Sequence, residues 1–119
     1  LNSGNRVPAD YNNVADTTLA TTIGTNGASV STVEHLLSAF RGMGVDNAIV
    51  ELDAPEVPIM DGSARPFVEM LKGVGTRTQE KYKKFLVVRQ EVSVSDAVGT
   101  AMFIPAPEFR RERMASIVP

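Results

Sequence analysis

Apolar residues recur at helical spacing in two stretches of the chain. The first set lies at positions i, i+3, i+4 and i+7 and consists of Val33, Leu36, Leu37 and Phe40. The second set repeats this spacing and consists of Phe67, Met70, Leu71 and Val74. Such spacing places the apolar side chains on one face of a helix. The pattern therefore predicts two amphipathic helices.

The residues that flank each stretch predict where the helices begin and end. Ser31, with Glu34 three positions later, forms a capping-box signature at the start of the first helix. Ser63 is expected to cap the second helix, with Pro66 in its first turn, where the missing N–H does no harm. A glycine is expected to end each helix, either Gly42 or Gly44 in the first and either Gly73 or Gly75 in the second.

The remaining apolar runs are short and rich in threonine and β-branched residues, which favours strands. Residues 14–23 read as one strand, with a turn at 24–27 and a return of residues 28–30 onto it. Further strands are expected at 48–52, 85–88, 92–94 and 100–104, the last two joined as a hairpin. The order of elements predicts an α+β fold with two helices on one face of a mainly antiparallel sheet, and lone β-α-β crossovers are the alternative to this pairing. The polar segment 76–84 reads as a linker or domain boundary, and the tail 110–119 matches no pattern.

Composition narrows the class of protein. The chain has 119 residues, of which 43% are hydrophobic, so it can bury a core. A net charge of −2 and 6% aromatic residues argue against nucleic-acid binding. The absence of cysteine excludes disulfides and thiolate metal sites, and no apolar run reaches the roughly 18 residues of a membrane span. Because the chain starts at Leu1 and stops abruptly at Pro119, we expect it to be a piece of a longer protein.

The candidate chemistry lies in the first helix, where His35, the only histidine, follows Glu34. On a helical wheel His35 points nearly opposite the apolar stripe, so we expect it to face water, a ligand or a second domain. Imidazole is a common zinc ligand, and a neighbouring carboxylate can act as general base. The simpler interpretation is a capping glutamate beside a solvated histidine. A catalytic zinc site also needs about three protein ligands, and this chain has no second histidine.

Two other groups of residues are weaker candidates. Ser63, in the sequence Asp61-Gly62-Ser63, would need a base to act as a nucleophile, and a turn followed by a helix cap explains all three residues. Asp53, Glu56 and Asp61 form an acidic cluster that could attract a divalent cation, although carboxylates in a proline-rich loop are usually just hydrated.

Three blocks of sequence, in this order and spacing, resemble the UDP-3-O-acyl-N-acetylglucosamine deacetylase family. They are residues 30–36 (VSTVEHL), 42–47 (GMGVDN) and 56–64 (EVPIMDGSA). The resemblance runs from about Pro8 to Phe109. Members of this family are cytoplasmic zinc amidases of lipid A biosynthesis in Gram-negative bacteria.

The resemblance implies two similar α+β domains with the active site between their helix layers. Residues 1–80 would be most of the first domain without its N-terminal strands, and residues 81–119 would be the truncated start of the second. The expected partners are a UDP-sugar lipid precursor and a missing C-terminal domain, with no nucleic acid and no stable membrane insertion.

The resemblance also implies individual roles. His35 would be a zinc ligand, Glu34 the general base, and Thr18, Leu19 and Ala20 a strand segment that borders the substrate. The family's other zinc ligands, a His and an Asp on a helix of the second domain, have no counterpart here. We therefore predict that the isolated chain is inactive and binds Zn²⁺ weakly or not at all. The alternative is a non-catalytic α+β interaction module.

Overall fold

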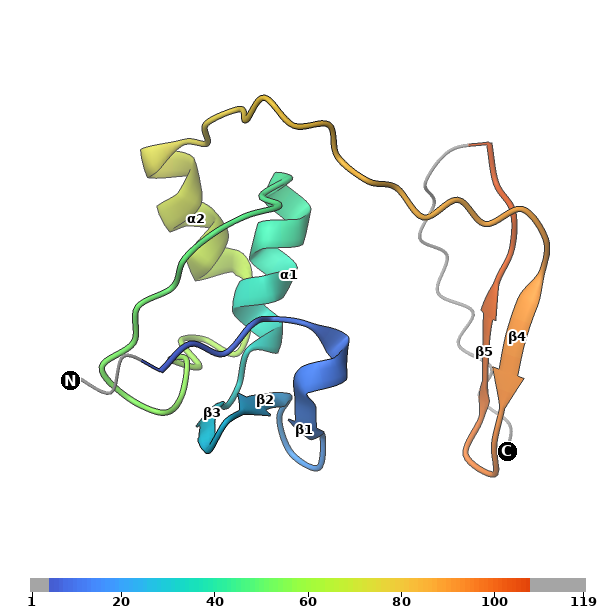
Figure 1. Ribbon diagram of the computed structural model, residues 1–119, viewed down its shortest axis with the longest axis horizontal. Helices are drawn as coiled ribbons and strands as arrows, with labels where there is room; N and C mark the ends of the chain where they lie inside the picture. Colours follow the sequence, from blue (N-terminus) through green and yellow to red (C-terminus); the bar gives the residue numbers. More distant parts are fainter. Residues whose placement is uncertain (1–4, 108–119) are drawn as a thin grey trace. The chain divides into compact units, whose positions relative to one another are not determined.

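Figure 1 shows the computed structural model, which describes residues 5–107. The chain divides into two compact units, Leu1–Lys81 and Tyr82–Pro119. The first unit contains the short 3-10 helix η1 (Tyr11–Asn13), a three-stranded sheet and two α-helices, and the second contains a β-hairpin. This combination of helices and antiparallel sheets confirms the predicted α+β class.

The sheet of the first unit has the strand order β1 (Val14–Asp16), β2 (Thr22–Thr25) and β3 (Ala28–Val30), all antiparallel. Asn26 and Gly27 connect β2 to β3 with φ angles of 52° and 77°. A two-residue type I′ turn needs positive φ at both positions, which asparagine and glycine tolerate. The predicted return of residues 28–30 onto the preceding strand is therefore confirmed.

The predicted strand over residues 14–23 is wrong in its middle. Asp16 Oδ1 accepts hydrogen bonds from the Thr18 N–H (3.1 Å) and from the Thr18 hydroxyl (2.7 Å). This local bonding turns the backbone, because an aspartate side chain can mimic a backbone turn. Thr18, Leu19 and Ala20 consequently form a bend between β1 and β2 and are not part of a strand.

Helix α1 spans Glu34–Met43 and ends at Gly44, whose φ of 71° is left-handed, as predicted. The predicted capping box is wrong, because the helix starts after Val33 and no side chain caps its first turn. Ser31 Oγ lies instead 2.9 Å from the hydroxyl of Thr22. The chain adopts a positive φ between Ser31 and the helix, so Ser31 does not occupy the N-cap position.

Helix α2 spans Arg65–Val74, with Ala64 as its N-cap, one residue later than predicted. Ser63 Oγ still accepts a hydrogen bond from the Arg65 N–H at 3.1 Å, and Pro66 lies in the first turn as expected. The helix ends at Gly75. In the described part of the chain, no helix is long and apolar enough to cross a membrane.

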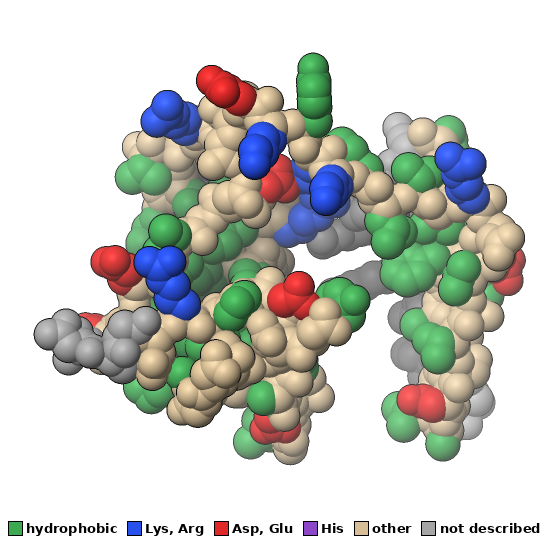
Figure 2. Space-filling model, viewed as in Figure 1, with side chains coloured by type: hydrophobic (Ala, Val, Ile, Leu, Met, Phe, Trp, Pro, Cys, Tyr) green, Lys and Arg blue, Asp and Glu red, His purple; other side chains and the backbone are tan. Residues whose placement is uncertain are grey.

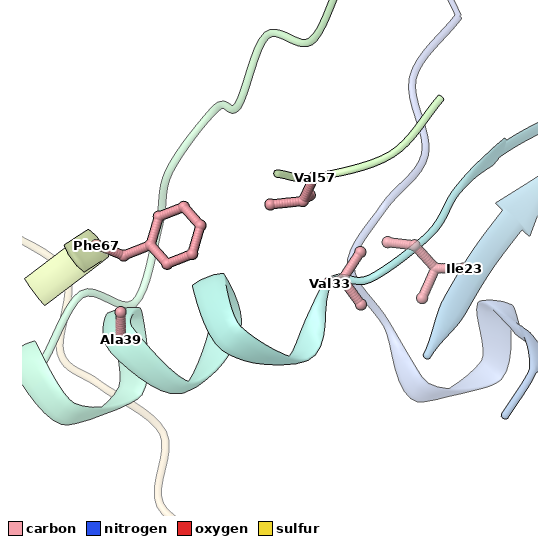
Figure 3. Packing of buried hydrophobic residues seen from close by; sticks show 5 residues of the cluster. All are labelled: Ile23, Val33, Ala39, Val57 and Phe67. Carbon is pink, nitrogen blue, oxygen red and sulfur yellow. The ribbon is translucent and has the colours of Figure 1, made fainter. Parts of the chain in front are cut away.

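The core of the first unit joins both helices to β2. Its buried members are Ile23, Val33, Ala39, Val57 and Phe67 (Figure 3). The predicted apolar faces are only partly correct, since Leu37, Met70 and Val74 are 38%, 53% and 83% exposed. Ala39 is instead fully buried, because α1 packs against α2.

The segment between the helices contains no strand, so the strand predicted at residues 48–52 is wrong. Ile49 is 87% exposed there. A strand requires a partner backbone, and no strand among residues 5–107 pairs with this segment. The chain is anchored further on, where the Ser31 N–H donates to Pro55 O and the Val57 N–H donates to Ser31 O, both at 3.0 Å.

The second unit is a hairpin of β4 (Val92–Ser95) and β5 (Thr100–Phe103), as predicted. Asp96 Oδ1 accepts hydrogen bonds from the N–H groups of Val98 and Gly99 in the connection, which lower the pKa of this carboxyl. Hydrophobic side chains lie on the surface of this unit (Figure 2). The run 85–88 is not a strand, and residues 76–84 hold no helix or strand. The tail 110–119 lies outside the described residues.

Candidate functional site

Glu34 and His35 are the first two residues of α1, at the end of the helix that meets the sheet (Figure 1). The Val33 N–H donates to Thr21 O at 3.2 Å, and the Thr21 N–H donates to Glu34 Oε2 at 3.1 Å. These two bonds join the start of the helix to the residue just before β2. The helix dipole also favours a carboxylate at this end of α1. The Glu34 carboxylate is therefore held in place by the backbone N–H of Thr21.

His35, the second residue of α1, is half-buried. Ala39, one turn later on the same side of α1, is fully buried, whereas His35 is not among the buried residues. The burial of Ala39 shows that α1 buries the side that faces α2, and the orientation of the His35 ring relative to this side stays a prediction. His35 as a whole residue is partly exposed. Within residues 5–107 no hydrogen bond or ion pair occupies it.

The predicted substrate segment lies directly before Thr21, in the bend of residues 18–20. Thr18 is held by Asp16, and this side-chain hydrogen bond is the main cause of the lowered pKa of the Asp16 carboxyl. Leu19 is 97% exposed, and Ala20 is half-buried. Because Thr21 bonds to Glu34, the bend is tied to the start of α1. The residue that directly follows the predicted substrate segment, Thr21, is therefore hydrogen-bonded to the Glu34 carboxylate.

Thr32 is a residue that the sequence analysis missed. It is 4% exposed, has a φ of 58°, and donates its hydroxyl hydrogen to Glu56 Oε1 at 2.6 Å. Positive φ is rare for a β-branched residue and costs about 1–3 kcal/mol, so such a residue persists only where its surroundings hold it. No spacing rule in the sequence reveals this contact, since its two partners are 24 residues apart.

The weaker candidates do not form sites. In the described ranges, no three His, Cys, Asp or Glu side chains come together as a metal-binding group. Glu56 is bonded to Thr32, and Asp61 accepts hydrogen bonds from the Ser63 N–H and hydroxyl, so the predicted acidic cluster with Asp53 is not assembled. The Ser63 bond also lowers the pKa of Asp61. Ser63 thus belongs to a turn that leads into α2.

The donor set tests whether zinc fits here. A partly exposed histidine at the start of α1 suits one coordination position. A catalytic zinc site takes about three protein ligands, and among residues 5–107 no group of three His, Cys, Asp or Glu side chains comes together. This part of the chain can therefore supply one ligand and a neighbouring carboxylate, but not a complete metal site.

Comparison with known proteins agrees with the three sequence blocks. The family model described as LpxC, UDP-3-O-acyl N-acetylglycosamine deacetylase, matches residues 1–116. A UDP-3-O-acyl-N-acetylglucosamine deacetylase from Syntrophus aciditrophicus is 69% identical over 97 residues, which are 82% of this chain and 31% of that protein. Proteins of the same name from Myxococcus xanthus and Saccharophagus degradans are 54% and 49% identical, over 87% and 92% of this chain and 33% and 36% of theirs.

The chain thus spans about a third of the length of these relatives. The match covers nearly all of its residues, including the helix that carries Glu34 and His35. The resemblance found in the sequence is confirmed, and the chain belongs to the UDP-3-O-acyl N-acetylglycosamine deacetylase family.

Proposed function

We propose that this chain is part of a zinc-dependent enzyme that removes the N-acetyl group from UDP-3-O-acyl-N-acetylglucosamine in lipid A biosynthesis. Membership of the family supports the reaction, since the relatives are named for it. The observation that carries the proposal is the 3.1 Å hydrogen bond from the Thr21 N–H to Glu34 Oε2. This bond fixes a carboxylate beside the partly exposed His35.

In this proposal His35 is one ligand of the metal, and the other ligands come from outside residues 5–107. Zinc, when bound, lowers the pKa of water and polarises a carbonyl. Residues 1–80 form most of a first domain, and residues 81–119 begin a second domain whose remainder supplies the missing ligands. The division of the chain at Lys81 is compatible with this arrangement.

Glu34 acts as the general base. It accepts a proton from a water molecule whose oxygen forms the new bond to the acetamide carbon. The carbon–nitrogen bond then breaks, acetate leaves, and the sugar nitrogen takes up a proton to become the free amine. Because one oxygen of the carboxylate is engaged by Thr21, the other can face the water. The bend of Thr18, Leu19 and Ala20 contacts the substrate beside this carboxylate.

A chimera tests the proposal. The 97 aligned residues of this chain would replace the matching 31% of the Syntrophus aciditrophicus relative, to which they are 69% identical. Deacetylation of UDP-3-O-acyl-N-acetylglucosamine would then be measured. His35→Ala should remove bound zinc and activity together. Glu34→Ala should retain zinc and lower kcat by about 10²–10⁴-fold.

Ser38→Ala is the matched control, because Ser38 is an exposed position on the same helix. It should change neither zinc content nor kcat. Equal and small effects of His35→Ala and Glu34→Ala would contradict the proposal and favour a non-catalytic interaction module.

A further inference from the structure

Two of the three sequence blocks meet immediately before the Glu34–His35 pair. Residues 55–57 run alongside Ser31, bound by two backbone hydrogen bonds of 3.0 Å that involve Pro55 and Val57. Between these two bonds, the Glu56 carboxylate accepts the Thr32 hydroxyl hydrogen at 2.6 Å. Three hydrogen bonds therefore fasten the loop to the residues that lead into α1.

We propose that Glu56 is a positioning residue that acts through Thr32, holding the backbone turn that aims the Glu34 carboxylate at the reaction. This inference rests on the proposed role of Glu34 as general base. Glu56 itself touches neither substrate nor metal in this scheme. Its contribution is to select one backbone conformation two residues before the base.

The conformation of Thr32 explains why a holding contact is needed. Its φ of 58° lies in the left-handed region, which is unfavourable for a β-branched side chain. If Thr32 relaxed to a negative φ, the direction of every following residue would change, beginning with Val33 and Glu34. A hydrogen bond to a charged acceptor is stronger than one between neutral groups. The Glu56 bond therefore opposes this relaxation where the backbone is least stable.

The effect reaches Glu34 through a second contact. The Val33 N–H donates to Thr21 O and the Thr21 N–H donates to Glu34 Oε2. These bonds tie the two residues after Thr32 to the residue just before β2. Val33 and Val57 are both buried in the core, 4% and 3% exposed. A shift at Thr32 would therefore displace Val33 and, with it, the Glu34 carboxylate relative to Thr21.

The burial of the two partners supports a specific role. Thr32 is almost completely buried, whereas Glu56 lies on an exposed loop where its carboxylate could simply be hydrated. Glu51, in the same connecting segment, is also exposed. The two glutamates differ in that Glu56 has a buried hydroxyl bonded to it. Glu51→Gln therefore serves as a matched control for changes at Glu56.

The test uses the active chimera and measures kcat, KM and zinc content. Glu56→Ala should lower kcat about tenfold or more, because small displacements of a catalytic group are costly, while KM and zinc content stay within twofold. Glu56→Gln keeps an acceptor oxygen and should recover most of the rate. Glu51→Gln should match the unchanged chimera. An unchanged kcat in Glu56→Ala, or a loss that follows zinc content, would overturn the proposal.

A double-mutant cycle tests whether Glu56 acts through Thr32. Glycine adopts positive φ without strain and has no hydroxyl, so Thr32→Gly removes both the strain and the bond. In that background Glu56→Ala should have no further effect on kcat. If Glu56→Ala lowered kcat in the Thr32→Gly background as well, the proposal would be overturned. The comparison within the Thr32→Gly background can be made even if Glu56→Ala alone fails to fold. If the chimera that carries no substitution were inactive, that result would instead count against the proposed function.

Discussion

The backbone N–H of Thr21 donates a 3.1 Å hydrogen bond to Oε2 of Glu34, across 13 residues of sequence. The bond links the end of the bend at residues 18–20 to the first residue of α1. Because of this bond, Glu34 has two properties that different substitutions can remove separately. One is acceptance of the Thr21 hydrogen, and the other is the basicity of the carboxylate.

Glu34→Gln and Glu34→Ala should therefore behave differently. Glutamine keeps an acceptor oxygen for Thr21 but is not a base, so we expect kcat of the chimera to fall about 10²–10⁴-fold with little loss of stability. Alanine removes both properties and should also lower the unfolding free energy by about 1–3 kcal/mol. Turnover and urea unfolding distinguish the two variants. Equal stability of both would show that the Thr21 bond contributes nothing.

The helices could be predicted from sequence because their signal is local. Spacing at i, i+3, i+4 and i+7 depends only on residues close in sequence and predicts a helix. Gly44 ends α1 as expected. The buried faces were less predictable, since α1 also packs on α2. A small residue such as Ala39 gives a weak apolar signal, yet it is fully buried. The strand predicted at 48–52 failed for a related reason, because β-branched residues become a strand only beside a partner.

The candidate site was predictable in part. The pair Glu34–His35 could be singled out from residue type and adjacency, and the three blocks gave its family. Its supporting contacts could not be predicted. Glu34 takes its partner from Thr21 rather than from a capping box, and Thr32 takes its partner from Glu56 in another block. Such pairings depend on how the chain folds back, and no sequence period records them.

Gly42 and Gly44 offer a matched pair at the end of α1. A Cβ at either position would meet no atom within 4 Å, but only Gly44 has a positive φ, of 71°. Gly42→Ala should therefore raise the unfolding free energy by about 0.5–1 kcal/mol, because alanine favours the helix. Gly44→Ala should lower it by about 1–2 kcal/mol. Urea unfolding of the 119-residue chain followed by circular dichroism measures both, and shifts of the same sign would contradict the assignment of the helix end.

The turn before α2 should be sensitive to acid. The Ser63 hydroxyl bond is the largest cause that lowers the pKa of Asp61 from 3.8, so the folded state favours the charged carboxylate. The resulting stabilisation is complete above the unfolded pKa of 3.8 and is lost as the pH falls through the lower folded value. An NMR titration should place the Asp61 midpoint below 3.8, and Ser63→Ala should move it back toward that value. A midpoint that does not respond to Ser63→Ala would exclude the hydroxyl as the cause.

Phe67 should be the most costly side chain of the core to remove. It is 7% exposed and packs among the buried residues between α1 and α2 (Figure 3). Phe67→Ala should lower the unfolding free energy by about 3–5 kcal/mol through lost burial and a cavity. Met70→Ala, on the same helix but 53% exposed, is the control and should cost much less. Urea unfolding of the two variants measures the difference, and similar losses would contradict the core as described.

The isolated 119-residue chain should neither retain stoichiometric zinc nor release acetate from UDP-3-O-acyl-N-acetylglucosamine. Its described residues bring one imidazole and no group of three metal-ligating side chains to the start of α1, whereas a catalytic zinc site takes about three protein ligands. Metal analysis after dialysis and an acetate assay test this, with the active chimera as the positive control. One zinc ion per chain, lost in His35→Ala, would mean that further ligands lie within these 119 residues.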